Sequence, residues 1–224
     1  INTETAVAIG EAMERLDDDR SLVAGVITGA GGTFCAGMDL KAFLAGERPF
    51  VGDRGFAGIV RRPPRKPLIA AVEGWAVAGG FEIALACDLI VAARDARFGI
   101  PEVKRGLVAA GGALIRLPRR IPYHLAVELA LTGDPIDAER AHAVGLVARL
   151  AEPGGAVAAA TELAGTIAAN GPLAVAATKR ILTADEARAW ERQAEITEPV
   201  FASEDAREGA RAFAEKRPPV WHGR

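Results

Sequence analysis

Buried-strand patterns recur along the chain, with turns and helical patterns between them. Short apolar runs rich in β-branched residues predict strands at residues 23–28, 68–72 and 89–93. Small residues at 29–32 predict a tight turn after the first strand, and residues 79–87 predict a helix between the second strand and the third. Strands that alternate with helices favour an α/β fold built on a parallel sheet.

The rest of the chain extends this organisation without a second core. Apolar positions at helical spacing predict a helix at residues 5–16, and the chain beyond Pro153 is alanine-rich and helical. We expect one domain, in which residues 1–150 form the core and residues 151–224 form a C-terminal helical region that packs across the core or against a neighbouring subunit. Further predictions are a helix beginning near Asp39, a loop at 46–67, helices at 126–131 and 138–144, a strand at 146–150, and helix interruptions at 171–172 and 183–185.

The composition argues against several classes of function. The net charge of −2 over 224 residues gives no general attraction to nucleic acids or anionic membranes. No apolar run reaches the roughly 18–20 residues of a membrane helix and the N-terminus lacks a signal-peptide pattern, so we expect a cytoplasmic protein. Cys35 and Cys87 are too few for a disulfide framework. His124, His142 and His222 lack ligand spacing, so we predict no metal site.

Nucleophilic hydrolysis is also poorly supported. Ser21 and Ser203 are the only serines of the sequence, and neither lies in a G-x-S-x-G elbow. Cys35 could act as a thiol nucleophile, but no histidine stands near it in the sequence to activate it.

Three short stretches combine small residues with a polar or charged side chain. Residues 34–41 form a small-residue turn that leads into a helix, whose early N–H groups lack intrahelical partners and could bind an oxyanion. In residues 74–82, a glycine pair lets a helix begin close to other backbone, with Glu82 in its first turn. Residues 98–103 hold Glu102 in an apolar segment stiffened by a proline.

Each stretch also has an ordinary structural explanation. The first fits a tight turn with an aspartate cap at Asp39, and Glu82 fits a carboxylate that favours a helix dipole. A strand lies between Glu82 and Glu102, however, so a helix–strand–turn connection can return both carboxylates to the same end of the sheet. The two side chains could therefore converge, as general acid–base chemistry requires.

The motifs F-C-A-G-M-D-L-K, A-V-A-G-G-F-E and F-G-x-P-E, in this order and spacing, resemble the enoyl-CoA hydratase/isomerase (crotonase) superfamily, and most of all a bacterial-type enoyl-CoA hydratase. The resemblance continues through residues 131–133, 138–147 and 213–217, so it spans essentially the whole chain. It implies a crotonase-like ββα spiral core with a C-terminal helical trimerisation region. It also implies a homotrimer or a dimer of trimers.

The resemblance assigns roles to particular residues. It implies that the backbone N–H groups of Met38 and Gly79 form an oxyanion hole for a thioester carbonyl, and that Glu82 and Glu102 are the catalytic pair. The implied reaction is hydration of a trans-2-enoyl-CoA to a 3-hydroxyacyl-CoA, as in the β-oxidation of fatty acids. Glu82 would orient and deprotonate the water, and Glu102 would donate the proton to Cα. Like charge in a partly apolar pocket would raise one of the two pKa values.

Coenzyme A enters this scheme as part of the substrate, and no separate cofactor is predicted. The resemblance implies CoA contacts at Ala36, Lys41, Phe213 and Lys216, where Lys41 could meet the CoA phosphates. Phe213 and Lys216 fit equally well an amphipathic terminal helix with a solvated charge. We expect residues 43–59 and the C-terminal helices to build the acyl pocket.

Alternatives within and beyond the family remain open. An enoyl-CoA isomerase or another acyl-CoA enzyme would use the same oxyanion hole, although retention of both glutamates favours hydration. A non-catalytic CoA- or protein-binding homologue would be expected to lose a glutamate or the Gly79–Gly80 pair, and both are kept.

Two departures from the family pattern stand out. Ala78 occupies a position where many relatives have glycine, a change that should leave the N–H of Gly79 usable. Relatives usually carry a β-hairpin-like segment before the first helix. We expect the sheet to have an open edge where those strands are absent.

Overall fold

The computed structural model describes residues 1–39, 46–105 and 109–184, together with residues 203–205, 208, 215, 217, 220, 222 and 223. The helix predicted to begin near Asp39 falls largely outside these residues. Within them, no helix is long and apolar enough to span a membrane.

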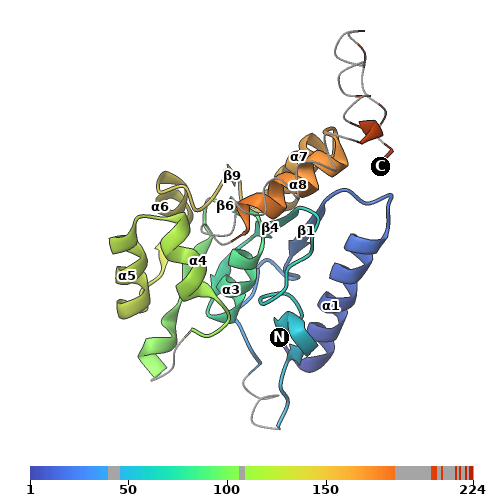
Figure 1. Cartoon of the computed structure of the whole chain (residues 1–224). Helices are drawn as coiled ribbons and strands as arrows, with labels where there is room; N and C mark the ends of the chain where they lie inside the picture. Colours follow the sequence, from blue (N-terminus) through green and yellow to red (C-terminus); the bar gives the residue numbers. More distant parts are fainter. Residues whose placement is uncertain are drawn as a thin grey trace.

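A four-stranded parallel sheet forms the centre of the molecule (Figure 1). Strand β4 pairs with β1 on one side and β6 on the other, and β9 pairs with β6. The strands predicted at 68–72 and 89–93 have the predicted bounds, whereas the last strand begins and ends later than the predicted 146–150. The four strands are β1 (Gly25–Thr28), β4 (Leu68–Val72), β6 (Leu89–Ala93) and β9 (Arg149–Ala151).

A second, three-stranded sheet runs beside the first. Strand β5 pairs in parallel with β7, β7 pairs antiparallel with β8, and a single bridge joins Cys35 to Ala76. Each of β4 and β6 is followed directly by a strand of the second sheet and then by a helical segment, α3 or η2. This succession is the predicted ββα spiral. The elements are β5 (Trp75–Val77), β7 (Arg97–Gly99), β8 (Ile136–Asp137), α3 (Gly79–Ala86) and η2 (Pro101–Arg105).

The remaining elements surround the two sheets. In the view of Figure 1, α1 lies to the right of the large sheet and α4, α5 and α6 lie to its left, and residues of α1, α4 and α5 contribute to the same buried cluster. The loop predicted at 46–67 is wrong in part, because it contains a short hairpin, and α4 was not predicted. The interruption near 171 is confirmed and α8 ends before residue 183, while residue 185 lies outside the described residues. The elements are α1 (Thr3–Asp18), β2 (Phe50–Val51), η1 (Gly52–Arg54), β3 (Gly55–Phe56), α4 (Ala113–Arg120), α5 (Tyr123–Thr132), α6 (Ala138–Ala143), α7 (Ala156–Ala168) and α8 (Pro172–Leu182).

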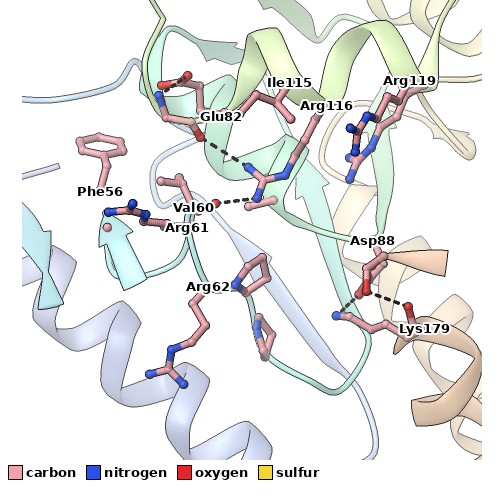
Figure 2. Close-up of a pocket in the computed structure, with 18 of the residues that line it drawn as sticks. Phe56, Val60, Arg61, Arg62, Glu82, Asp88, Ile115, Arg116, Arg119 and Lys179 are labelled. Atoms are coloured by element: carbon pink, nitrogen blue, oxygen red, sulfur yellow. Dashed lines mark hydrogen bonds and ion pairs between the residues drawn. The ribbon is translucent and has the colours of Figure 1, made fainter. Parts of the chain in front are cut away.

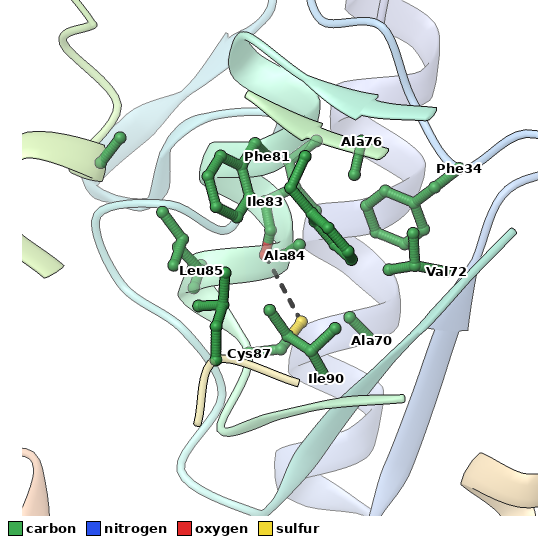
Figure 3. Close-up of a cluster of buried hydrophobic side chains, with 14 of the residues drawn as sticks. Phe34, Ala70, Val72, Ala76, Phe81, Ile83, Ala84, Leu85, Cys87 and Ile90 are labelled. Atoms are coloured by element: carbon green, nitrogen blue, oxygen red, sulfur yellow. Dashed lines mark hydrogen bonds between the residues drawn. The ribbon is translucent and has the colours of Figure 1, made fainter. Parts of the chain in front are cut away.

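Apolar layers cover both faces of the large sheet. On one face, Phe34, Val72, Ala76 and Phe81 belong to the main buried cluster, which Figure 3 shows around α3. The opposite face packs against α7 through a smaller buried cluster of Ile69, Ala71, Val91, Ala156 and Ala160. Because every residue of β4 is buried, α3 begins from a rigid base and can hold a reactive side chain in place.

Candidate functional site

A cavity of about 1470 Å³ extends along α3, between the β2–β3 hairpin, α4 and α8 (Figure 2). One end is lined by Ala36, Met38, Gly79, Glu82 and Glu102. Its volume exceeds the roughly 300–1,000 Å³ typical of small-molecule sites, so it can hold a long, flexible ligand.

The two glycine-rich stretches meet at this end of the cavity. The bridge between Cys35 and Ala76 includes Cys35 N–H donating to Trp75 O at 2.9 Å and Val77 N–H donating to Cys35 O at 3.0 Å. Beyond it, a Cβ atom on Gly37 would lie 3.2 Å from Gly79 N. Gly37 itself has φ of +97°, which glycine adopts without strain. The backbone segment next to Met38 therefore lies close to Gly79, and the N–H groups of Met38 and Gly79 are the two that were predicted to act together.

Close packing fixes the start of α3. A Cβ atom on Gly80 would clash with the carbonyl oxygen of Cys35, and one on Gly79 would lie 2.6 Å from the Phe56 ring. Gly79 is the first residue of the helix, where a backbone N–H has no intrahelical acceptor. Ala78 has φ of +52°, a backbone conformation that costs a residue with a Cβ about 1–3 kcal/mol.

Glu82 is almost completely buried, with 4% of its surface exposed. Its Oε1 accepts the backbone N–H of Gly111 at 2.6 Å and that of Ala113 at 3.2 Å. Burial raises the pKa of this carboxyl, the two hydrogen bonds oppose the rise, and the charge of Glu102 adds to it. Glu82 is thus a strengthened base whose orientation is set by backbone donors.

Glu102 comes to the same cavity from the second spiral turn. It lies in η2 directly after β7, is half-buried, and lines the cavity with Glu82. Both carboxyls line this cavity, and the charge of Glu102 contributes to the raised pKa of Glu82. The structure therefore brings together the two glutamates that the sequence singled out.

Arg116 was not anticipated from the sequence. One guanidinium nitrogen donates to Val60 O at 2.6 Å, and another donates to Gly111 O at 3.4 Å (Figure 2). Its charge also lowers the pKa of Glu82. Arg116 lies on α4 beside the buried positions Ala113 and Leu117, and because α4 itself was not predicted, no pattern in the sequence indicated this residue.

The predicted CoA contacts are only partly described. Ala36 is exposed and lines the cavity. Lys41, Phe213 and Lys216 lie outside the described residues. Phe50 and Phe56 line the cavity, as does α8 through residues such as Leu173. That residues 43–59 and the C-terminal helices build an acyl pocket stays a prediction.

The cysteines and histidines do not form a second centre. The Gly37 N–H lies 3.3 Å from Cys35 Sγ, and burial raises the pKa of the Cys87 thiol to about 12. His142 Nδ1 is 2.8 Å from the carbonyl oxygen of Val147, so this side chain makes a local contact just after α6. In the described part of the chain, no group of three or more His, Cys, Asp or Glu residues could hold a metal ion.

The chain is similar to known proteins in sequence and in fold. The family model for enoyl-CoA hydratase/isomerase matches residues 1–224. A crystal structure of enoyl-CoA hydratase EchA1 from Mycobacterium marinum has a TM-score of 0.96 and 62% identity, over 100% of this chain and 90% of that one. Enoyl-CoA hydratase EchA19 of Mycobacterium tuberculosis is 44% identical, over 100% of this chain and 88% of that protein. Carnitinyl-CoA dehydratase of Proteus mirabilis is 42% identical, over 100% of this chain and 90% of that protein.

Proposed function

This chain belongs to the enoyl-CoA hydratase/isomerase family, and we propose that it hydrates a trans-2-enoyl-CoA to a 3-hydroxyacyl-CoA. One observation carries the proposal: Glu82 and Glu102 line the same cavity as Met38 and Gly79. The names of the relatives, enoyl-CoA hydratase and carnitinyl-CoA dehydratase, both denote acyl-CoA chemistry in which water is added or removed, which supports the assignment.

In the proposed reaction, the thioester oxygen accepts the N–H groups of Met38 and Gly79. Negative charge develops on this oxygen when water attacks Cβ, so the two donors stabilise the transition state more than the substrate. Loss of one such donor costs about 3 kcal/mol in other enzymes. The N–H of Gly79, at the start of α3, has a fixed position because the backbone there packs against Phe56 and Cys35.

The two glutamates then divide the proton transfers. Oε1 of Glu82 is occupied by two backbone N–H groups, so Oε2 accepts the proton as the water oxygen bonds to Cβ. Glu102 donates a proton to Cα as the enolate collapses. The proton gained by Glu82 balances the one lost by Glu102, and the net change is the addition of one water. Each transfer contributes roughly 10²–10⁴-fold to the rate.

The assembly and cofactor use follow from the same proposal. We expect a homotrimer or a dimer of trimers, and a reaction that needs no metal or redox cofactor because the oxyanion hole stabilises the charge. Sedimentation of the purified protein tests the first expectation, and activity after treatment with a chelator tests the second.

The deciding experiment is hydration of crotonyl-CoA and longer trans-2-enoyl-CoAs, followed by loss of enoyl absorbance. We expect activity that falls strongly in Glu82→Gln and Glu102→Gln. Glu128→Gln is the matched control, since Glu128 is exposed on α5 and does not line the cavity. Isomerisation of a 3-enoyl-CoA without any hydration would identify an isomerase instead, and inactivity on every acyl-CoA would favour a binding protein.

A further inference from the structure

The cavity continues well past the two glutamates into a region that we call the distal lobe. It is lined by the residues at the C-terminal end of α3 and by parts of α4 and α8. The lobe comprises Ala86, Asp88, Arg119, Arg120, Lys179 and Arg180.

The direction of α3 identifies the distal lobe as the acyl side, an argument that rests on the proposed function. The thioester carbonyl is bound at Gly79, and Glu82 acts on the carbons that follow it in the acyl group. Continuing the same way along α3 leads to Ala86, seven residues after Gly79 and about 10 Å away at 1.5 Å per residue. Coenzyme A leaves the carbonyl in the opposite direction.

Positive charge in the distal lobe is only partly compensated. Lys179 Nζ lies 2.6 Å from Asp88 Oδ2, so these two side chains neutralise each other. Arg120 donates to the carbonyl oxygen of Cys87, which carries no formal charge. Within the described residues, Arg119 and Arg180 have no carboxylate partner, and Asp88 is the lobe's one acidic side chain. The lobe therefore has an excess of cations.

The arginines near the β2–β3 hairpin provide a contrast. Arg62 pairs with Glu14 and Asp53 at 2.9 Å, and Arg65 contacts Asp17 and Asp18 at 3.4 Å. These two arginines thus have acidic neighbours at the surface. Arg119 and Arg180 are exposed, line the cavity and lack such a neighbour within the described residues, so their guanidinium groups are available to an anionic ligand.

We propose that the distal lobe binds an anionic group at the far end of the acyl chain, so that the preferred substrate is an enoyl-CoA whose acyl group ends in a carboxylate. Arg119 and Arg180 would supply the guanidinium groups, which match the geometry of a carboxylate. The apolar side chains that line the cavity suit a methylene chain, and they include Ile115, Leu173 and Ala176. With bonds of about 1.5 Å, roughly eight to ten carbon atoms span the distance.

The test compares three trans-2-enoyl-CoAs of equal chain length that end in a carboxylate, a methyl group or a quaternary ammonium. We expect kcat/KM to be at least tenfold higher for the carboxylate than for the methyl compound, and lowest for the cation. In the double variant Arg119→Gln/Arg180→Gln the carboxylate-to-methyl ratio should fall towards one. Arg140→Gln, on an exposed part of α6 outside the cavity, is the matched control and should keep the wild-type ratio.

Two outcomes would overturn the inference. One is a wild-type enzyme that uses the methyl compound as well as the carboxylate. The other is a double variant in which KM rises equally for every substrate, which would mean that the arginines bind the phosphates of CoA. Crotonyl-CoA is too short to reach the distal lobe, so its hydration reports on the proposed function alone. A wild-type enzyme that hydrates crotonyl-CoA but shows no preference for the carboxylate refutes only the present inference.

Discussion

Glu82 Oε1 accepts the Gly111 N–H at 2.6 Å, although 28 residues separate the two positions in the sequence. The donor precedes α4 and the acceptor lies in the first turn of α3, so the contact joins two helices across the cavity. It fixes one carboxylate oxygen and leaves the other for chemistry. The orientation of the proposed base therefore depends on a backbone group that no side-chain motif reveals.

Replacement of Glu82 by glutamine should lower activity and raise stability. The amide cannot accept the proton from water, so we expect kcat/KM to fall about 10²–10⁴-fold. Its oxygen can still accept the N–H groups of Gly111 and Ala113, while the buried charge is removed. Activity assays and thermal unfolding measure the two effects, and a variant less stable than wild type at neutral pH would contradict the prediction.

The same substitution has a signed pH dependence. The pKa of Glu82 is raised above its ordinary value of 4.5, so the folded protein binds this proton more tightly than the unfolded chain. The contribution of Glu82 to the free energy of unfolding is therefore most favourable at low pH and declines as pH rises through the ordinary pKa to the raised one. The stability gain of Glu82→Gln should be smallest under acid conditions and should grow through this window.

Gly111→Ala should displace the Glu82 carboxylate. A Cβ atom at position 111 would overlap Glu82 Oε2, so either the side chain or the start of α4 must move. We expect a large fall in kcat and a loss of stability of about 1–3 kcal/mol. Gly165→Ala is the control, because nothing lies near that position on α7 and helix propensity predicts a gain of about 0.5–1 kcal/mol. Wild-type kcat in Gly111→Ala would show that the contact is dispensable.

Ala78→Gly should stabilise the protein. Ala78 has φ of +52° and ψ of −133°, a conformation that glycine adopts more easily. Relief of this strain is worth about 1–3 kcal/mol, which exceeds the entropy that a glycine adds to the unfolded chain. Urea unfolding of the variant measures the difference. Ala158→Gly, at an exposed position within α7, is the opposite control and should lose about 0.5–1 kcal/mol.

The strands of the large sheet were predictable because burial on both faces leaves a continuous apolar run, as in Leu68–Val72. The second sheet was not, since β5 and β7 have three residues each and begin with the exposed Trp75 and the half-buried Arg97. Only pairing with a partner strand defines such segments. Helix α4 was missed for a related reason, because Pro118 disfavours a helix locally and packing of Leu117 overrides it.

The candidate site likewise has some residues that the sequence could predict and others that only the folded structure reveals. Glu82 and Glu102 could be singled out because a carboxylate in an apolar segment is visible in the sequence. The N–H of Gly111 and the reach of Arg116 to Val60 O depend on chain segments that meet only in the folded protein. Sequence patterns therefore singled out the proposed reactive groups, and the structure shows the backbone donors that orient Glu82.

Arg116→Met should shift the pH dependence of activity rather than simply reduce it. Arg116 lowers the pKa of Glu82, and without this charge the pKa should rise further. Because the proposed base must be ionised, the acidic limb of the kcat/KM profile should move to higher pH. Arg116→Lys keeps the charge and should move it less, whereas Arg140→Met changes a remote charge and should leave it in place. If Arg116 only supports α4, its loss would lower kcat/KM equally at every pH, and the limb would not move.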